Sequence, residues 1–502
     1  MEEDKFYLAR SSGVLLHPTS FPDSPVCGTF GKPAREWLRF LSQNGIGVWQ
    51  FLPLSLTDGI GSPYSSPSSF SLNPWFLDVD DLVRDGFLPK NANDILPGSK
   101  EINNDFIDFD LANFRSKRVA KLLVNHWNFQ NNESKEEFDN WKLRQSWLIS
   151  HAKFMFLREK NEFKPWWKWE KRYTNLIESV NLSEQNNYLL EYFLVQWHLD
   201  RQWTCLKILA NKLGVKLYGD MPFYVSRDSV DVWSNKSLFS INETGRVFTQ
   251  SGVPPDYFSE TGQLWGTPVY RWRKHKITKF KWWRERVKRH FNLVDLLRVD
   301  HFRALDSFWA VSGSDLTAKN GYWSSSPGLK MLNLFKKDNK GNLPIIAEDL
   351  GVITQNVERL RDHFFLPGMK ILQFAFDGNN NNPYLPENIE GNNWVVYTGT
   401  HDNSTTLSWW NNLNEETKSL ISKRFNKNYF ESPSWNFIEM GLSSNAKLFI
   451  SPLQDLMGLD DRSRLNKPGT ITNNWKWRLK KYDKNFKDSI KAYGERSSFW
   501  DR

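Results

Sequence analysis

Short apolar runs alternate with amphipathic stretches along most of this chain. Each apolar run ends in polar or charged residues, and the runs lie at 46–55, 215–225, 293–302, 343–351, 368–378, 393–403 and 447–458. Between them, residues 352–364 and 189–214 repeat their apolar positions with the period of a helix, and Gly214 is placed to end the second. Strands that alternate with helices predict an α/β fold with a parallel sheet.

The number of apolar runs favours one particular parallel sheet, the (β/α)8 TIM barrel. A barrel needs eight strands, and we expect the missing one near residues 69–82, SFSLNPWFLDVDDL. The whole chain, 1–502, then forms a single catalytic barrel with inserted, largely helical subdomains. Function in such barrels is concentrated at the carboxyl ends of the strands.

Two segments interrupt the alternation of strands and helices. Residues of about 105–190 are rich in Lys, Asn, Glu and Trp and predict a helical insertion. Residues 251–272, SGVPPDYFSETGQLWGTPVYRW, are crowded with proline, glycine and aromatics and predict a long ordered loop. Long loops in compact domains are usually functional.

Cysteine content and the N-terminus indicate a cytoplasmic protein. The chain has 2 cysteines, Cys27 and Cys205, and no CxxC pair, which fits a reducing compartment. The start, MEEDKFYLAR, is acidic and has no apolar core of a signal peptide. No apolar run reaches the length of a membrane span, so no membrane partner is expected.

Charge and aromatic content point to different ligands. The net charge of +9 raises the question of nucleic acid, but the basic residues are dispersed among acids, and we expect no nucleic-acid partner. Aromatic residues make up 15% of the chain, and several lie in loops where core packing explains them poorly. Loop aromatics suit ligands with flat apolar faces, which include sugars and nucleic-acid bases.

Carboxylates end several of the predicted strands. Asp300 stands in RVDHF, Glu348 in IIAEDLG and Asp402 in GTHDN, while Asp220 belongs to a fourth run, LYGDMPFY. Such groups converge at one barrel mouth if the strands are neighbours. Two carboxylates on either side of a bond, one a nucleophile or base and the other an acid, cleave glycosides.

The neighbours of two of these acids predict different pKa values. Arg298 lies two residues before Asp300 and shares its face of the strand, so we expect it to lower the pKa of Asp300. Glu348 follows an apolar run, which predicts a raised pKa and the role of acid. Asp349 fits the acid equally well, and an ion pair at the strand end is the structural alternative for Asp300.

Other chemistries lack their motifs. His301 and His401 each stand next to an aspartate, without the spacing of HxH, HExxH or a carboxylate cage. The chain has no GxGxxG, GK[ST] or GxSxG. We therefore expect no metal and no cofactor.

Long blocks of the sequence resemble the 4-α-glucanotransferases known as amylomaltase or disproportionating enzyme, relatives of the α-amylases. The blocks follow the family's order and include SGVLLHPTSFP, SPYSSPSSFSLNPWFLD, YGDMPFYVSRDSVDVWSNKSLF, RVDHFRALDSFWAV, PIIAEDLGVIT, VVYTGTHDNSTTLSWW and DLMGLDDRSRLNKPGTITNNWKWRL. The resemblance covers residues 12 to 480. It implies a (β/α)8 barrel and a retaining double displacement on α-1,4-glucans or malto-oligosaccharides.

The resemblance also implies roles for individual residues. Asp300 resembles the nucleophile, Glu348 the acid/base, and Asp402 the carboxylate that steadies the transition state. Tyr64 resembles a stacking platform. Trp265 resembles part of the loop over the acceptor side, which implies that residues 251–272 cover the substrate. The further residues that resemble partners or sugar ligands at the cleavage site are Arg298, His401, Asp220 and Asp377.

Departures from the family pattern leave the three carboxylates untouched. WGTP replaces the frequent WGNP, PPDYF replaces PPDAF, and LNKPGT replaces MNTPGT. These changes concern the acceptor. The same acids would also serve an α-1,4-glucan hydrolase, and a catalytically dead glucan-binding protein is the non-enzymatic alternative.

Overall fold

Eight parallel strands form the centre of the molecule. The structure is a computed structural model that describes residues 9–100, 104–174, 186–255, 259–425 and 432–502. The strands pair in the order β10-β11-β12-β1-β2-β3-β6-β9, which is chain order around a ring. Their bounds are β1 Ser11–Leu15, β2 Val48–Gln50, β3 Lys216–Met221, β6 Leu296–Val299, β9 Ile345–Ala347, β10 Gly368–Ile371, β11 Trp394–Tyr397 and β12 Leu448–Pro452.

The two end strands of this order meet and nearly close the barrel. The Ala347 amide of β9 donates a hydrogen bond to the Pro367 carbonyl, immediately before β10, at 2.8 Å. The strand interiors are buried on both faces, as the continuous apolar runs require. The expected (β/α)8 fold is therefore confirmed.

The eighth strand lies elsewhere than expected. It is β1, Ser11–Leu15, which pairs with β2 and β12. Residues 69–82 instead hold a 3-10 helix, Pro74–Phe76, and the start of α2, Val79–Arg84. The reason is local capping: Asp78 accepts the Asp81 amide and starts α2, and Pro74 occupies a first-turn position.

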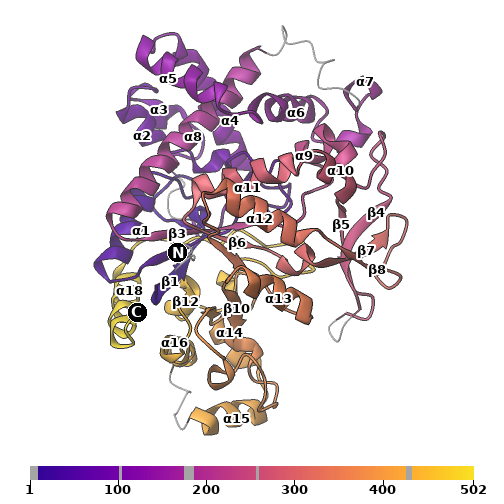
Figure 1. Cartoon of the computed structure of the whole chain (residues 1–502). Helices are drawn as coiled ribbons and strands as arrows, with labels where there is room; N and C mark the ends of the chain where they lie inside the picture. The colour runs from indigo at the N-terminus through magenta and orange to yellow at the C-terminus, as the bar shows by residue number, and fades with distance from the viewer. Residues whose placement is uncertain (1–8, 101–103, 175–185, 256–258, 426–431) are drawn as a thin grey trace.

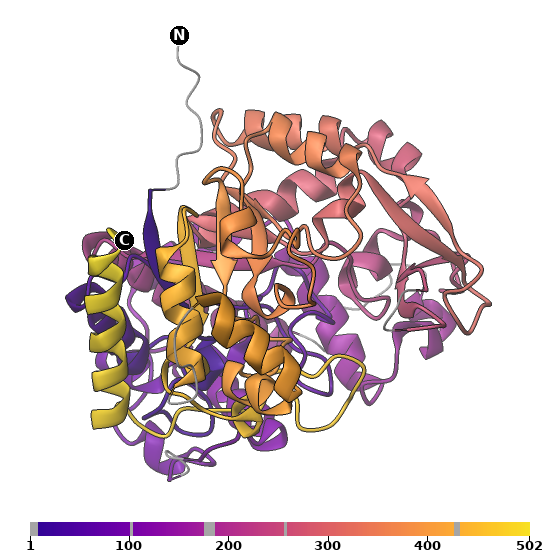
Figure 2. The same ribbon diagram turned by 90° about the horizontal axis from the view of Figure 1, so that it is seen from below.

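Helices surround the ring (Figure 1). Gly214, with φ 71°, follows α8 and ends it as expected. Figure 2 shows α18, the yellow helix at the C mark, along the outer edge of the molecule. The helices between and after the strands are α1 Lys32–Gln43, α8 Asn186–Lys212, α9 Val230–Ser234, α10 Trp272–Ile277, α11 Lys281–Leu293, α12 Gly328–Asp338, α13 Gln355–His363, α14 Thr406–Asn412, α15 Glu415–Phe425, α16 Pro433–Ser443, α17 Leu453–Leu456 and α18 Lys484–Phe499.

A helical subdomain stands between β2 and β3, at the top of Figure 1. It packs on the long helix α8 through buried apolar side chains such as Leu123, Phe138 and Trp197. Besides α2, its helices are α3 Ala92–Ile95, α4 Phe109–Trp127, α5 Asn132–Leu143, α6 Leu148–Lys160 and α7 Lys171–Thr174.

A second, antiparallel sheet extends from the barrel at the right of Figure 1. Its order is β5-β4-β7-β8, with β4 Thr249–Val253, β5 Gln263–Pro268, β7 Ser307–Ser312 and β8 Tyr322–Ser325. The segment 251–272, expected as a loop, is thus largely a hairpin of β4 and β5. Its strands pair through backbone hydrogen bonds, which the Pro/Gly-rich composition did not indicate. Tyr257 and Phe258, which the sequence places in this segment, lie outside the described residues.

Candidate active site

Arg298 on β6 joins two of the predicted site acids. One guanidinium nitrogen lies 2.6 Å from Asp220 Oδ2 on β3, and another lies 2.8 Å from Asp300 Oδ1 directly after β6. Arg298 and Asp220 are buried, whereas the Asp300 side chain is 32% exposed. The pair at the strand end that the sequence suggested therefore exists, and it leaves Asp300 accessible from the barrel mouth.

The pKa of Asp300 departs from the expectation. Burial raises the pKa of Asp300 to about 7; Arg298 lowers it, whereas Asp220, Glu348 and Asp402 raise it further. The prediction of a lowered pKa was wrong because the sequence showed the nearby cation but not the loss of water around Asp300, which has the largest effect, or the three other carboxylates around it. Asp300 thus gains its charge near neutral pH in the free protein.

Glu348 lies on the neighbouring strand, directly after β9. Its Oε2 accepts the His301 amide at 2.7 Å, and its Oε1 accepts the Leu350 amide at 3.1 Å. Burial raises the pKa of Glu348, while Arg298 and the two amides oppose the rise. The direction agrees with the expectation from the apolar run before it. Asp300 and Glu348 therefore both hold a proton more tightly than exposed carboxylates do.

The contacts of Glu348 and Asp349 differ, which their positions along the strand did not reveal. Asp349 Oδ2 lies 2.5 Å from Arg361 Nη1 on α13, and its Oδ1 accepts the Met369 amide at 2.8 Å. Both oxygens of the buried Asp349 are thus occupied between β9, β10 and α13. Asp349 serves the barrel wall, and Glu348 is the acid that neighbours Asp300.

Tyr64 connects this centre to His401 and Asp402. The Tyr64 hydroxyl donates to Asp220 Oδ2 at 2.7 Å, and its ring stacks on His401 with centroids 5.2 Å apart and planes at 9°. His401 Nε2 lies 3.3 Å from Asp402 Oδ1. Burial lowers the pKa of His401, although Asp402 acts in the opposite direction. A neutral imidazole is therefore held between the tyrosine ring and the carboxylate.

Trp265 reaches the same region from the antiparallel sheet. Its ring meets the His301 ring edge to face, with centroids 4.8 Å apart, and contacts Tyr224 at 5.9 Å. His301 is the residue after Asp300 in the chain, so Trp265 contacts the immediate neighbour of Asp300. The side chain is 37% exposed, which leaves a flat aromatic surface open to a ligand.

Asp377 stands apart from the other predicted site residues. It is exposed, and its Oδ1 accepts the Asn379 amide of its own loop at 2.9 Å. This hydrogen bond lowers the pKa of Asp377. Within the described residues no hydrogen bond or ion pair joins it to Asp300 or Glu348, so its place in the site stays a prediction.

Two residues near Asp402 were not singled out from the sequence. Asn466 Nδ2 donates to Asp402 Oδ1 at 2.7 Å, and the Arg464 guanidinium donates to the Asp402 carbonyl. Both belong to the block DLMGLDDRSRLNKPGT, so their position in a family block was the available signal. In the described part of the chain no cluster of three His, Cys, Asp or Glu could hold a metal ion, and no helix has the length and apolarity to cross a membrane.

The fold and the site together define a class. The chain forms a (β/α)8 barrel in which an accessible aspartate pairs with an arginine, a glutamate follows the neighbouring strand, and aromatic surfaces lie beside them. Barrel enzymes that act on glycosidic bonds through carboxylate pairs are built in this way.

Comparison with known proteins identifies the family. Residues 16–484 match the family model described as 4-alpha-glucanotransferase. The chain is 41% identical over 478 residues to the 4-alpha-glucanotransferase of Synechocystis sp., covering 93% of this chain and 94% of that protein. It is 38% identical over 488 residues to the enzyme of the same name from Thermus thermophilus, covering 94% and 95%. The chain therefore belongs to the 4-alpha-glucanotransferase family.

A solved structure agrees with this assignment. Amylomaltase from Streptococcus agalactiae in complex with acarbose superposes with a TM-score of 0.91 at 32% identity, covering 98% of this chain and 99% of that one. The chain is accordingly an enzyme that transfers glucan segments, and the alternative of a hydrolase is not favoured.

Proposed function

We propose that the chain moves a segment of an α-1,4-glucan to the 4-hydroxyl of an acceptor glucose or glucan, with retention of configuration. Malto-oligosaccharides serve as donor and acceptor in this proposal, and the acarbose bound to the related amylomaltase supports it. The observation that carries the proposal is the accessible Asp300, which forms an ion pair with Arg298, together with Glu348 at the end of the neighbouring strand.

The first step needs one proton and one ionised carboxylate. Glu348 donates its proton to the glycosidic oxygen, and Asp300 attacks the anomeric carbon as the bond to that oxygen breaks. The product is a covalent glycosyl ester on Asp300 and a free sugar chain. Raised pKa values at both acids fit a site that holds a shared proton, and the contact with Arg298 favours the negative charge on Asp300.

The second step reverses the first with a new partner. Glu348, now ionised, takes the proton of the acceptor 4-hydroxyl, whose oxygen attacks the anomeric carbon and releases Asp300. Water in place of the acceptor would give hydrolysis, so the outcome depends on what covers the site. Trp265 and the β4–β5 hairpin, residues 249–268, are our candidates for that cover.

The exposure of the other predicted site residues suggests which of them contact the sugar and which support the site. In our proposal Tyr64 and His401 form the platform beside the scissile sugar, and Asp402 binds hydroxyls of that sugar. The exposed Asp377 is open to a sugar hydroxyl further along the chain. Asp220 has only 1% of its side chain exposed and shares Oδ2 between Tyr64 and Arg298, so we assign it to hold those two groups.

The pH dependence of activity follows from the pKa of Asp300. Protonated Asp300 is no nucleophile, and its pKa of about 7 means that kcat/KM should fall as the pH drops through about 7. The Asp220→Asn variant loses a charge that raises this pKa, so its acid limb should move to lower pH. Both profiles are measured with maltotriose, and an acid limb of the unmodified enzyme near the ordinary aspartate range would contradict the assignment.

Tyr64 offers a test of the platform. Tyr64→Phe keeps the ring on His401 but removes the donor to Asp220, and we expect kcat/KM to fall about 5- to 10-fold. Tyr64→Ala also removes the stacking surface, and we expect a loss of about 100-fold.

The control for Tyr64 is Tyr482→Phe, which deletes a buried tyrosine hydroxyl bonded to the Pro33 carbonyl at 3.0 Å. Its kinetics should equal those of the unmodified enzyme. Tyr64→Ala kinetics within twofold of the unmodified enzyme would show that the platform lies elsewhere.

Incubation with maltotriose distinguishes the candidate functions. Transfer gives glucose together with a ladder of longer oligomers, hydrolysis gives maltose and glucose alone, and a binding protein leaves maltotriose unchanged. We expect the ladder. The proposal includes a reducing, cytoplasmic setting, which the two unpaired cysteines, buried Cys27 and exposed Cys205, support.

A further inference from the structure

We propose that Asp455 is a positioning residue for the reaction, because it closes the loop 398–406 that carries His401 and Asp402. The inference rests on the role proposed above for Asp402. Asp455 lies on α17, directly after β12, and is only 1% exposed, so it acts through the loop and not on the sugar.

The Asp455 carboxylate accepts hydrogen bonds from both ends of the loop. Thr398, the first residue after β11, donates its hydroxyl to Asp455 Oδ2 at 2.6 Å. Thr406, the first residue of α14, donates its hydroxyl to the same oxygen at 2.7 Å and its amide to Oδ1 at 2.7 Å. The three donors fix the points where the loop leaves the strand and where it enters the helix.

The chain segment after Asp455 holds the middle of the same loop. Asp461 accepts the Thr405 amide at 2.8 Å. Asn466 donates to the Asp402 carboxylate at 2.7 Å, and its own amide donates to the His401 carbonyl at 3.1 Å. The segment after β12 therefore holds the loop after β11 in place by hydrogen bonds at both of its ends and at His401 and Asp402.

The chemistry of the contact requires a carboxylate. Asp455 is 1% exposed and belongs to no ion pair in the described part of the chain. Burial raises the pKa of Asp455, and the hydrogen bonds from Thr398 and Thr406 oppose the rise. A buried carboxylate without a cation is costly and is retained where its acceptors are needed. An asparagine has one acceptor oxygen and cannot accept from the Thr406 amide and both hydroxyls at once. Its NH2 group would face either that amide or the two threonine hydroxyls, which would have to turn round to accept.

The test is a double-mutant cycle with Asp402. Asp455→Asn should lower kcat about 10- to 100-fold, because a shift of the loop displaces Asp402 from the reacting sugar. In the Asp402→Asn background the same change should cost less than about threefold, because Asp402 is already gone and only His401 remains for the loop to position. α-Maltosyl fluoride as donor keeps the turnover of the weak variants measurable.

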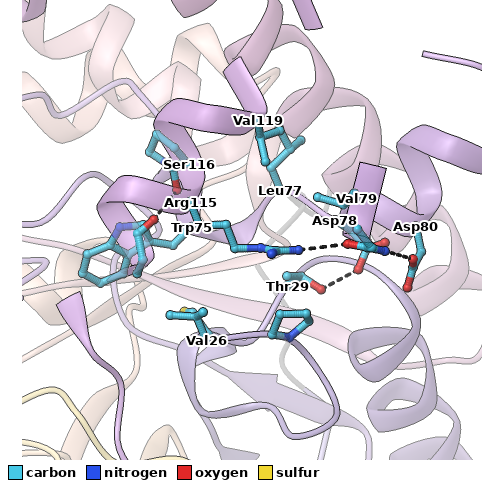
Figure 3. Close-up of a pocket in the computed structure, with 15 residues that line it drawn as sticks. Val26, Thr29, Trp75, Leu77, Asp78, Val79, Asp80, Arg115, Ser116 and Val119 are labelled. Carbon is cyan, nitrogen blue, oxygen red and sulfur yellow. Dashed lines mark hydrogen bonds between the residues drawn. The ribbon is translucent and has the colours of Figure 1, made fainter. Parts of the chain in front are cut away.

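Asp78→Asn is the matched control. Asp78 is also buried and belongs to no ion pair of the described residues. It accepts the Thr29 hydroxyl at 2.6 Å (Figure 3) and the Asp81 amide at 2.9 Å. Its surroundings are the segment 25–29, α2 and α4, which carry no predicted site residue. We expect a similar fall in Tm for both variants and unchanged kcat for Asp78→Asn.

The outcomes separate the inference from the function it rests on. A large effect of Asp402→Asn with a small effect of Asp455→Asn, or equal effects of Asp455→Asn in both backgrounds, would overturn the positioning role. A negligible effect of Asp402→Asn would instead overturn the role proposed for Asp402. The expected cycle is a large effect of each single change and no further loss in the double variant.

Discussion

Replacing Asp300 by asparagine is expected to lower kcat with maltotriose by about 10⁴-fold or more, because the amide does not form the glycosyl ester. The amide keeps the shape of the side chain, and its oxygen still accepts from Arg298, which also retains Asp220. We therefore expect an intact fold. Product formation is followed by chromatography of the oligosaccharides, and substantial residual turnover would exclude Asp300 as the nucleophile.

The same variant should be more stable than the unmodified enzyme at alkaline pH. The folded state holds the Asp300 proton up to a pH of about 7, and the unfolded chain releases it near the ordinary aspartate value, so the stability that this proton confers is lost as the pH rises between them. Asp300→Asn removes that loss. After discounting for the partly exposed side chain, we expect a gain of about 1–2 kcal/mol at alkaline pH and none below the ordinary aspartate value. Denaturant unfolding at both pH values measures it.

Replacing Glu348 by glutamine should produce a loss that depends on the leaving group. With maltotriose the sugar leaves only after protonation, and we expect kcat to fall about 10³- to 10⁴-fold. With α-maltosyl fluoride the leaving group needs no proton, so the first step should stay close to its normal rate. Glutamine still accepts the His301 and Leu350 amides in part, which preserves the local backbone.

Asp349→Asn is the comparison for Glu348. Asp349 is the adjacent acid, but its contacts are with Arg361 and the Met369 amide, so its loss should lower Tm and should not distinguish between donors. If Asp349→Asn showed the leaving-group dependence and Glu348→Gln did not, the acid would have to be reassigned.

Apolar runs predicted the barrel because seven of its strands are continuous apolar segments followed by polar residues. Residues 11–15 were missed because SSGVL is short and its burial comes from pairing with β12, more than 400 residues away in the chain. The segment 69–82 was misassigned because its apolar residues pack from helical turns that Asn73 and Asp78 cap. The local pattern of apolar residues indicates whether a segment is a helix or a strand. Which strand it pairs with depends on the whole fold.

The site shows the same limit in electrostatic terms. The contact of Arg298 with Asp300 follows from their spacing on one strand, and the structure contains it. The raised pKa of Asp300 does not follow, because it comes first from the burial of the side chain by the whole fold and then from Asp220, Glu348 and Asp402 on other strands and loops. Spacing along one strand predicts contacts between residues of that strand, but not contacts with residues from other strands.

The central claim is that Asp300 carries the glycosyl group between donor and acceptor. Glu348→Gln incubated with α-maltosyl fluoride should form the ester without an acid and then accumulate it, because no base remains to activate the acceptor. Mass spectrometry of the intact protein and of its peptides measures the adduct. We predict the added mass of one maltosyl group on the peptide that contains Asp300; an adduct on the peptide of Asp402, or no adduct during turnover, would contradict the account.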